Sequence, residues 1–329
     1  MERRRLTGLR PQAYEHPLDA QALNALQKTS GLETLVRKCN EWGFERLLRV
    51  QLTGSHLRVT QDSLPQVYEK LLAACDILDL PKVPELYLAG GGDVNAFTAG
   101  VEKTLIVINA GAVDLLSDDE LLFVIAHEVG HIKSGHVLYY QIAEFLPVVG
   151  AIVGTATFGI GELLSAGLQM ALLNWKRMSE FTADRAGLLG CQDANVAITA
   201  MMKIAGLPNK YRDAINPEDF IGQARDFTAL DSDKLTWFAK WFSTMGQTHP
   251  WTVMRASEFL GWVDTKGYEA VLNNPQTIPA SVPGAALPAA GFCTQCGKPL
   301  VAGARFCPGC GAPVVAPAAR AQAGHPQAT

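Results

Sequence analysis

The stretch from Ser117 to His131 constrains this chain more than any other part of it, because it specifies a helix and sets polar groups along it. Ser117-Asp-Asp-Glu120 has the pattern of a capping box, in which the serine and the glutamate satisfy backbone N–H groups at the start of a helix. The apolar run that follows is interrupted only by a histidine, a glutamate and a second histidine. A helix with three polar groups at fixed spacing is therefore the first element that we predict.

His127 and His131 stand four residues apart, so both imidazoles leave the same face of this helix and can share one metal ion. Glu128 lies about 100° further round the helix, where its carboxylate can hold a metal-bound water without ligating the metal. This spacing is the H-E-x-x-H pattern of zinc hydrolases. The competing interpretation is an amphipathic helix with two incidental histidines.

A third ligand must come from another segment. In one class of zinc hydrolases a third histidine stands ten residues after the first, but that position is Val137 here. His136 lies about half a turn off the ligand face, so we expect a surface residue or a neighbour of a ligand. Residues 175–189 read as a helix in which Glu180 and Asp184 are four apart. One carboxylate can complete the zinc site while the other orients a ligand imidazole, an arrangement typical of catalytic zinc.

Residues 84–110 change character to short β-type runs. Glu85–Ala89 and Thr104–Asn109 are rich in aliphatic and β-branched residues, and a glycine-rich segment lies between them. We expect a small antiparallel sheet beside the zinc helix. From Ser117 to about Val271 the pattern is helical nearly throughout, so the predicted fold is α+β and mainly helical.

The N-terminal region carries one hairpin signal, because Leu47–Leu52 and His56–Thr60 flank Thr53-Gly54. The rest of this region is predicted to be helical and to pack on the core. The predicted domains are an N-terminal region (1–80), a catalytic domain (81–272), a Pro/Ala-rich linker (273–291), a cysteine module (292–314) and a disordered tail (315–329).

The cysteine module contains two near copies of Cys-x-x-Cys-Gly, with Cys293 and Cys296 in the first and Cys307 and Cys310 in the second. Two such knuckles predict a closed tetrahedral zinc site that resembles a zinc ribbon. So short a module cannot bury a core, and its metal would supply the folding free energy. A pair of redox-active dithiols is the alternative.

Charge bears on the partners. The chain has 28 basic and 32 acidic residues, and its net charge of −4 does not suit a protein that wraps a polyanion. The ribbon carries only Lys298 and Arg305 as charged residues, so we expect a protein partner there rather than nucleic acid. No secretory signal is recognisable and the paired thiols suit metal, which together favour a reducing, cytoplasmic compartment.

An apolar stretch lies between the two helices that carry the candidate ligands. Phe145–Gly161 holds no charge, but a single membrane crossing would put His131 and Glu180 on opposite sides. Two crossings need about 40 apolar residues plus a turn, more than this stretch supplies. We therefore expect a helical hairpin over the site, with residues 145–173 either buried in the protein or in peripheral contact with a membrane.

Three motifs in this order resemble the HtpX and CAAX-prenyl-protease type of gluzincin metallopeptidases. They are His-Glu-Val-Gly-His at 127–131, Ser-Glu-Phe-Thr-Ala-Asp-Arg-Ala-Gly at 179–187 and Thr-His-Pro at 248–250, with Arg255 beyond. Asn95-Ala-Phe-Thr-Ala-Gly100 resembles that family's edge strand at the active site. The resemblance extends over residues 60–260 and implies a zincin-like core.

The resemblance implies zinc ligands at His127, His131 and Glu180, with Glu128 as the catalytic base. Asp184 is then the residue that orients a ligand imidazole.

The resemblance also implies that the strand containing Asn95, Ala96 and Phe97 pairs with an extended peptide. His249 precedes a proline, and at a turn it could present its imidazole to the oxyanion of the reaction. A structural role for His249 is the alternative.

The predicted function is that of a zinc-dependent endopeptidase, with one catalytic and one structural Zn²⁺. Zinc lowers the pKa of water and polarises the scissile carbonyl, and Glu128 moves the proton. One alternative is a protein-binding or chaperone-like module that keeps the fold and the zinc. Another is a nucleic-acid adaptor led by the ribbon. The presence of a full ligand set together with Glu128 favours the enzyme.

Overall fold

The structure is a computed structural model that describes residues 3–29, 32, 35–36, 43–143, 166–211, 216–229 and 251–276. Several predictions fall outside these residues. They concern His249, the four ribbon cysteines, most of the linker and the middle of the apolar hairpin, and they stay predictions.

Helices make up most of the described chain, as the sequence predicts. They are α1 (Pro11–Tyr14), α2 (Pro17–Gln27), α4 (Phe44–Ser55), α5 (Pro65–Ile77), α6 (Ala110–Leu115), α7 (Asp118–Lys133), α9 (Ala166–Cys191), α10 (Ala194–Ile204), α11 (Pro217–Ala229), α13 (Thr252–Asp264) and α14 (Gly267–Asn273), with a short 3₁₀ helix at Asn209–Tyr211. The strands are β1 (Leu57–Val59), β2 (Glu85–Ala89), β3 (Ala96–Ala99) and β4 (Leu105–Asn109).

The four strands form one small sheet in the order β1-β2-β4-β3. β4 is interior and buries Leu105–Ile108, whereas β3 lies at the edge. The predicted sheet beside the zinc helix is present, but it is mixed rather than antiparallel, because β2 and β4 run parallel. Only β1 with β2 and β3 with β4 are antiparallel pairs. The chain passes from β2 across the position of β4, forms the edge strand and then returns between them.

The predicted hairpin at 47–60 is wrong in its first half. Leu47–Leu52 belong to α4, and only Leu57–Val59 form a strand, which pairs with β2. Leu48 and Leu52 are four residues apart and therefore share one helix face, which packs on the sheet. An apolar run so short suits a helix that covers a sheet as well as it suits a strand.

The capping box of α7 is confirmed. Ser117 Oγ accepts a hydrogen bond from the N–H of Glu120, and Glu120 Oε2 accepts one from the N–H of Ser117. Lys203 on α10 donates to the same carboxylate at 2.6 Å. These contacts fix where α7 begins and hence which of its side chains face α9.

Glycines allow α7 and α9 to approach each other closely. A Cβ on Gly130 would lie 2.4 Å from the Cβ of Ala186, and one on Gly190 would lie 2.2 Å from the Cβ of Ala126. Both separations are far below van der Waals contact, so larger residues would push the helices apart. This close packing brings the polar residues of the two helices face to face.

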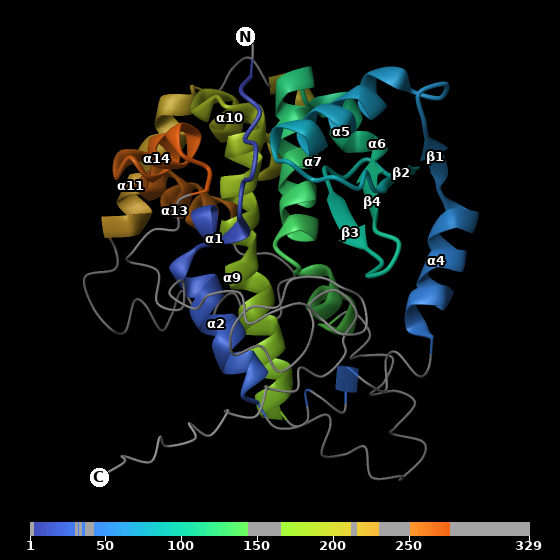
Figure 1. The fold of residues 1–329 in the computed structure, drawn as a ribbon. Helices are drawn as coiled ribbons and strands as arrows, with labels where there is room; N and C mark the ends of the chain where they lie inside the picture. The colour runs from blue at the N-terminus through green and yellow to red at the C-terminus, as the bar shows by residue number, and fades with distance from the viewer. Residues whose placement is uncertain are drawn as a thin grey trace, which may run out of the picture.

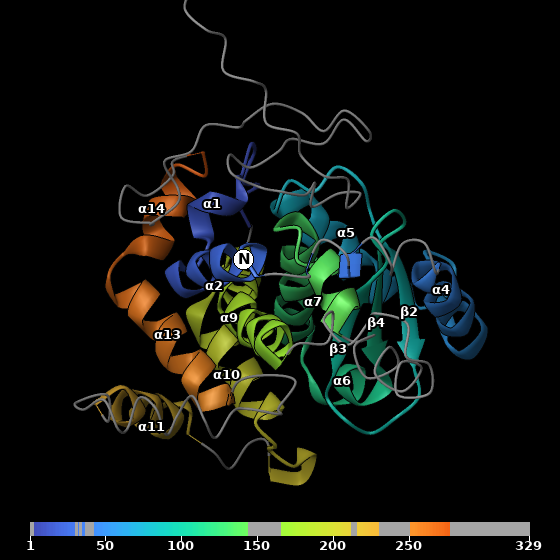
Figure 2. The same ribbon diagram turned by 90° about the horizontal axis from the view of Figure 1, so that it is seen from below.

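The elements form layers around this helix pair. α7 and α9 run side by side through the centre, with the sheet next to α7 and α2 along the lower half of α9 (Figure 1). Seen from below, α4 lies beyond the sheet, while α13 and α14 lie beyond α9 (Figure 2). Buried apolar residues of the sheet, α5, α7, α9, α10 and α13 make one continuous core.

The N-terminal segment packs on α9. Leu26 of α2 is fully buried and joins Leu172 and Trp175 in a second apolar cluster. The predicted apolar hairpin is described only at its two ends, by the helical residues 137–143 and by α9 from Ala166 onward. None of the described helices is both long and apolar enough to cross a membrane.

Candidate metal centre

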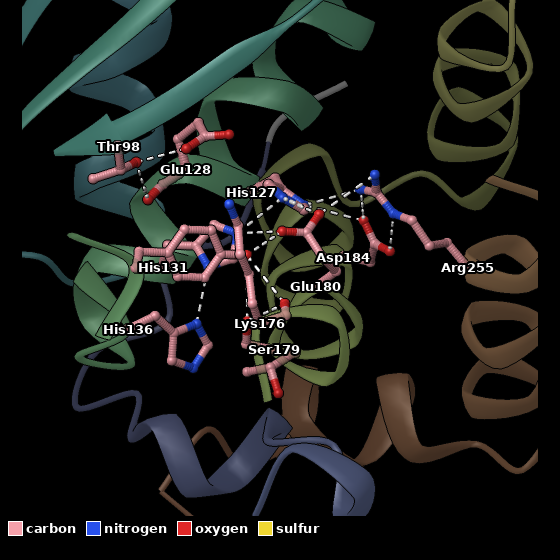
Figure 3. A network of polar contacts seen from close by, with 12 residues as sticks. Thr98, His127, Glu128, His131, His136, Lys176, Ser179, Glu180, Asp184 and Arg255 are labelled. Carbon is pink, nitrogen blue, oxygen red and sulfur yellow. Dashed lines mark hydrogen bonds and ion pairs between the residues drawn. The ribbon is translucent and has the colours of Figure 1, made fainter. Parts of the chain in front are cut away.

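Three side chains from α7 and α9 converge on one point between the helices. His127 Nε2 and His131 Nε2 lie 3.1 Å apart, and the carboxylate oxygens of Glu180 lie 3.6 Å from the first and 3.4 Å from the second. All three side chains are buried, and they form a group that could hold a metal ion. Figure 3 shows both rings turned toward Glu180.

The three separations can be tested against a tetrahedral zinc site. Ligand atoms about 2.0–2.2 Å from a tetrahedral ion lie about 3.3–3.6 Å from one another, the edge of the tetrahedron. The two Nε2 atoms lie 3.1 Å apart, and each lies near a different oxygen of Glu180, Oε2 at 3.6 Å from His127 and Oε1 at 3.4 Å from His131. Two imidazole nitrogens and a carboxylate are also the donor types that zinc prefers, so the residues fit the ion.

On the far side of His127, a buried ion pair fixes the ring. Asp184 Oδ1 lies 3.0 Å from His127 Nδ1, and Arg255 of α13 donates to both oxygens of that carboxylate, at 2.9 and 2.5 Å. Burial raises the pKa of Asp184, but Arg255 and His127 outweigh it and hold that pKa below its usual value. An ionised Asp184 accepts the Nδ1 proton and leaves Nε2 as an acceptor directed at the site.

The same contacts act on the basicity of His127. Burial lowers the pKa of its imidazole, but the hydrogen bond and charge of Asp184, together with Glu180, raise it overall. A more basic imidazole is a better donor to a metal. Arg255 also reaches Glu180, with Nη1 at 3.5 Å from Oε2, so one guanidinium ties both carboxylates of α9 together.

His131 has different neighbours. Its Nδ1 lies 2.9 Å from Nδ1 of His136, and its ring lies 4.9 Å from that of Tyr140. Burial, with the charges of neighbouring imidazoles, lowers the pKa of His131 to about 3, so this ring is neutral. The Tyr140 hydroxyl donates to Glu180 Oε1. Burial, with the charge of Glu180, raises the pKa of Tyr140 well above its usual value and keeps it a donor.

Glu128 lies beside the cluster without joining it. Its Oε2 accepts a hydrogen bond of 2.6 Å from the hydroxyl of Thr98, which stands on β3. In Figure 3 the Glu128 side chain extends toward the strand while the two histidines point to Glu180. The edge strand and the carboxylate predicted to be the base are therefore in direct contact.

A cavity of about 340 Å³ opens onto the cluster. His127, Glu128, Glu180 and Arg255 line it at the metal centre. The remainder of its wall comes from the segment before β3, from α6, from the first turns of α7 and from residues of α10 and α13: Asp93, Val94, Asn95, Ala96, Ala112, Phe123, Val124, Ile204 and Thr252.

The structure brings most predicted site residues together. His127, Glu128, His131, Glu180 and Asp184 meet as described, and Asn95 and Ala96 line the cavity. Phe97 belongs to β3, and its side chain is 36% exposed. Its neighbours Ala96 and Thr98 alternate with it along the strand, so they occupy the opposite face of the sheet.

Sequence reasoning missed several neighbours of the cluster. Arg255 was noted only for its place after a His-Pro pair, and no role was assigned to Thr98 or Tyr140. His136 was expected at the surface or beside a ligand, and it is buried against His131.

Two segments of the chain match known sequence profiles. Residues 59–263 match the profile described as peptidase family M48, and residues 292–314 match the profile of a zinc-ribbon domain. No solved structure matches the chain.

Curated relatives agree with these matches. Plastoglobule-localized metallopeptidase 48 of Arabidopsis thaliana is 31% identical over 261 residues, which cover 79% of this chain and 74% of the relative. Protease HtpX homolog 2 of Methanosarcina acetivorans is 29% identical over 182 residues, covering 48% of this chain and 60% of the relative. The homologue from Methanosarcina mazei is 29% identical over 181 residues with the same coverage. The chain thus spans less than two thirds of the length of these archaeal relatives.

Proposed function

This chain belongs to peptidase family M48, and from that membership we propose that it is a zinc-dependent endopeptidase whose catalytic ion is held by His127, His131 and Glu180. That it is a metalloprotease follows from the family match and its relatives. The assignment of these three ligands rests above all on one observation. Two Nε2 atoms and a carboxylate, contributed by two helices, stand at the spacing of a tetrahedral site that opens onto a cavity.

Glu128 is the residue that we propose moves the proton. When bound, zinc polarises the scissile carbonyl and lowers the pKa of the attacking water. Glu128 then accepts the water's proton on its carboxylate and passes it to the departing amine. Its position next to the ligands and at the cavity wall supports this role. Thr98 holds Oε2, which limits the orientations of the carboxylate.

The substrate strand is a second part of the proposal. Among the described strands, β3 pairs only with β4, so an extended polypeptide can add to its other side through backbone hydrogen bonds. Asn95 and Ala96 line the cavity at the start of this strand and would face the peptide near the ion. His249, three positions before the cavity residue Thr252, remains the proposed donor to the oxyanion.

The C-terminal module is proposed to hold a second, structural zinc through Cys293, Cys296, Cys307 and Cys310. These cysteines lie within the segment that matches a zinc-ribbon domain. Because a four-thiolate site has no open position, this ion would fold the module rather than take part in hydrolysis. A protein partner is the proposed ligand of the ribbon, since the module offers few basic groups to a nucleic acid.

The decisive experiment replaces Glu128 with Gln and measures casein cleavage and zinc content together. We expect wild-type protein to cleave casein in a chelator-sensitive way. Glu128→Gln should keep its zinc and lose about 10²–10⁴-fold in kcat, because the amide cannot accept the proton. Asp119→Asn serves as the matched control, since it makes the same chemical change at an exposed position of α7.

Two results would contradict this scheme. Wild-type turnover in Glu128→Gln would remove the proposed base. Stable binding of an unfolded polypeptide by zinc-loaded wild-type protein, without any cleavage, would support the chaperone-like alternative instead.

A further inference from the structure

Behind His131, a line of polar contacts leads away from the metal centre to the N-terminal segment. His131 Nδ1 lies 2.9 Å from His136 Nδ1, and His136 Nε2 lies 3.2 Å from Oδ2 of Asp19 on α2. The three side chains are buried, with Asp19 fully enclosed. Figure 3 shows His136 beyond His131, on the side away from Asp184. His131 and His136 therefore connect the metal centre, one after the other, to the distant carboxylate of Asp19. We call these three residues the relay.

The carboxylate at the far end sets the direction of each hydrogen bond. Burial raises the pKa of Asp19, but His136 and the Thr182 hydroxyl outweigh it, so that pKa lies below its usual value and the group is ionised. An ionised carboxylate only accepts, so His136 Nε2 carries a proton. A ligand imidazole keeps the Nε2 lone pair for the ion, so the proton of His131 is on Nδ1, which donates to His136 Nδ1. His131 Nε2 is left with its lone pair directed at the site.

Stability alone does not explain Asp19. Its Oδ2 accepts a hydrogen bond of 2.6 Å from Thr182 as well as the one from His136. Its Oδ1 is buried and has no hydrogen-bond partner among the residues that the structure describes. Burying an incompletely bonded carboxylate costs free energy that an apolar residue at this position would not. Its place behind His136 and the proposed ligand His131 indicates a role at the metal centre instead.

We propose that Asp19 and His136 are positioning residues for the metal centre, which hold His131 in the tautomer and orientation that bind zinc. This inference rests on the proposed function, because it presumes that His131 is a ligand. Partners in this outer position orient a ligand ring and fix which of its nitrogens carries the proton. Asp184 does the same for His127 through a direct contact.

With Asp19 included, the metal centre extends to the N-terminal segment of the chain. Asp184 lies within the segment that matches peptidase family M48, whereas Asp19 precedes that segment. Asp19 reaches His136 because α2 packs along α9, where Thr182 holds its carboxylate. Trp175 covers His136 with a ring contact of 5.6 Å and helps to keep water from the relay. The N-terminal segment is thus a working part of the site.

Zinc affinity of the full-length chain is the measurement that tests this. A common background of Cys293→Ser with Cys296→Ser removes the second zinc site, and competition with a chromophoric chelator gives the dissociation constant. We expect Asp19→Asn and His136→Leu each to weaken zinc binding about 10–100-fold. Because Asp19 acts through His136, the double variant should bind zinc no more weakly than the single variant with the lower zinc affinity.

A control separates positioning from general loosening of α2. Leu26→Ala removes buried apolar contacts of the same helix and leaves the relay intact. We expect it to lower the unfolding temperature of the metal-free protein more than Asp19→Asn does, while zinc affinity stays near that of the parent. If Leu26→Ala weakens zinc binding as much as Asp19→Asn, the role of Asp19 is structural and the proposal fails.

His131→Ala distinguishes failure of this inference from failure of the proposed function. If His131→Ala abolishes zinc binding while Asp19→Asn and His136→Leu leave it unchanged, the ligand set stands and the relay is refuted. If His131→Ala leaves zinc binding unchanged, the proposed ligand set itself is wrong.

Discussion

The two histidines of α7 have different partners at their Nδ1 atoms. His127 contacts a carboxylate directly, and Arg255 neutralises that carboxylate. His131 contacts a second histidine, His136. The carboxylate partner of His136 is Asp19, which also accepts a hydrogen bond from the hydroxyl of Thr182. The pKa of His127 is raised while that of His131 is lowered to about 3. One helix therefore presents two imidazoles of different basicity, because the charge next to each differs.

This difference indicates whether a variant on each side of the site should change the stability of the fold or the affinity for the metal. The His127 side depends on a buried ion pair, whose loss leaves an uncompensated charge. On the His131 side, Asp19 accepts hydrogen bonds from His136 and Thr182 and has no Arg or Lys within ion-pair distance among the described residues, so removing its charge breaks no ion pair of that kind. Variants on the first side should therefore act mainly on folding, and variants on the second mainly on metal binding.

The largest effect is expected from Arg255→Met. This change leaves the carboxylate of Asp184 buried without its cation and should lower the free energy of unfolding by about 3–5 kcal/mol. Urea denaturation of metal-free protein measures it. The double variant Arg255→Met with Asp184→Asn is the control, since it removes the charges of the closer pair and leaves only the longer contact of Arg255 with Glu180 unbalanced, so it should recover much of the loss. A single variant as stable as the parent would mean that the ion pair is not what secures the His127 side.

A smaller effect, shared by both sides, is expected from Gly190→Ala. The new Cβ would meet the Cβ of Ala126 and force α7 and α9 apart. Overpacking of this kind costs about 1–3 kcal/mol. Because Glu180 is carried by α9 and both histidines by α7, zinc affinity should fall as well. Gly222→Ala, which meets nothing within 4 Å, is the matched helix control. Equal stability of the two variants in thermal unfolding would show that the helix pair tolerates a wider spacing.

The same contrast explains what the sequence could predict. The three candidate ligands and Asp184 could be predicted because they follow local patterns: His127 and His131 are i, i+4 on one helix, and Glu180 and Asp184 are i, i+4 on another. The role of Arg255 could not be predicted, because it depends on how α13 packs against α9. The resemblance to HtpX-type metallopeptidases is confirmed by the family match and by the HtpX relatives. Asp19 could not be predicted, because nothing in the spacing of residues says that α2 will pack against Thr182.

Errors in the fold have a similar origin. The sheet was expected to be antiparallel because β2, β3 and β4 follow one another in the chain, but tertiary packing places β4 between the other two. Its uninterrupted apolar run, Leu105–Ile108, is the local sign of an interior strand. At Leu47–Leu52, the apolar spacing fits a strand and a helix equally. The helix forms because its apolar side chains cover a face of the sheet that would otherwise be exposed to solvent.

The smallest predicted effect concerns the carboxyl of Glu15, whose pKa depends on the charge of Asp19. Glu15 lies on the same segment, where burial and then the charge of Asp19 raise the pKa of its carboxyl to about 7. The folded state thus holds the Glu15 proton more tightly than the unfolded chain does. This contribution to stability is complete below the usual pKa of about 4.5 and is lost as the pH rises through about 7. Glu15→Gln should flatten that part of the stability profile.

Asp19→Asn should lower the pKa of Glu15, measured by NMR of the labelled carboxyl, because one of its two causes is removed. The pKa of Glu15 should fall by less than half of its rise from 4.5 to about 7, since burial is the larger cause. Arg255→Met, on the other side of the site, should leave the Glu15 titration where it is. If both variants shift Glu15 equally, the two sides share one electrostatic network and the contrast between a clamped His127 and a relayed His131 does not hold.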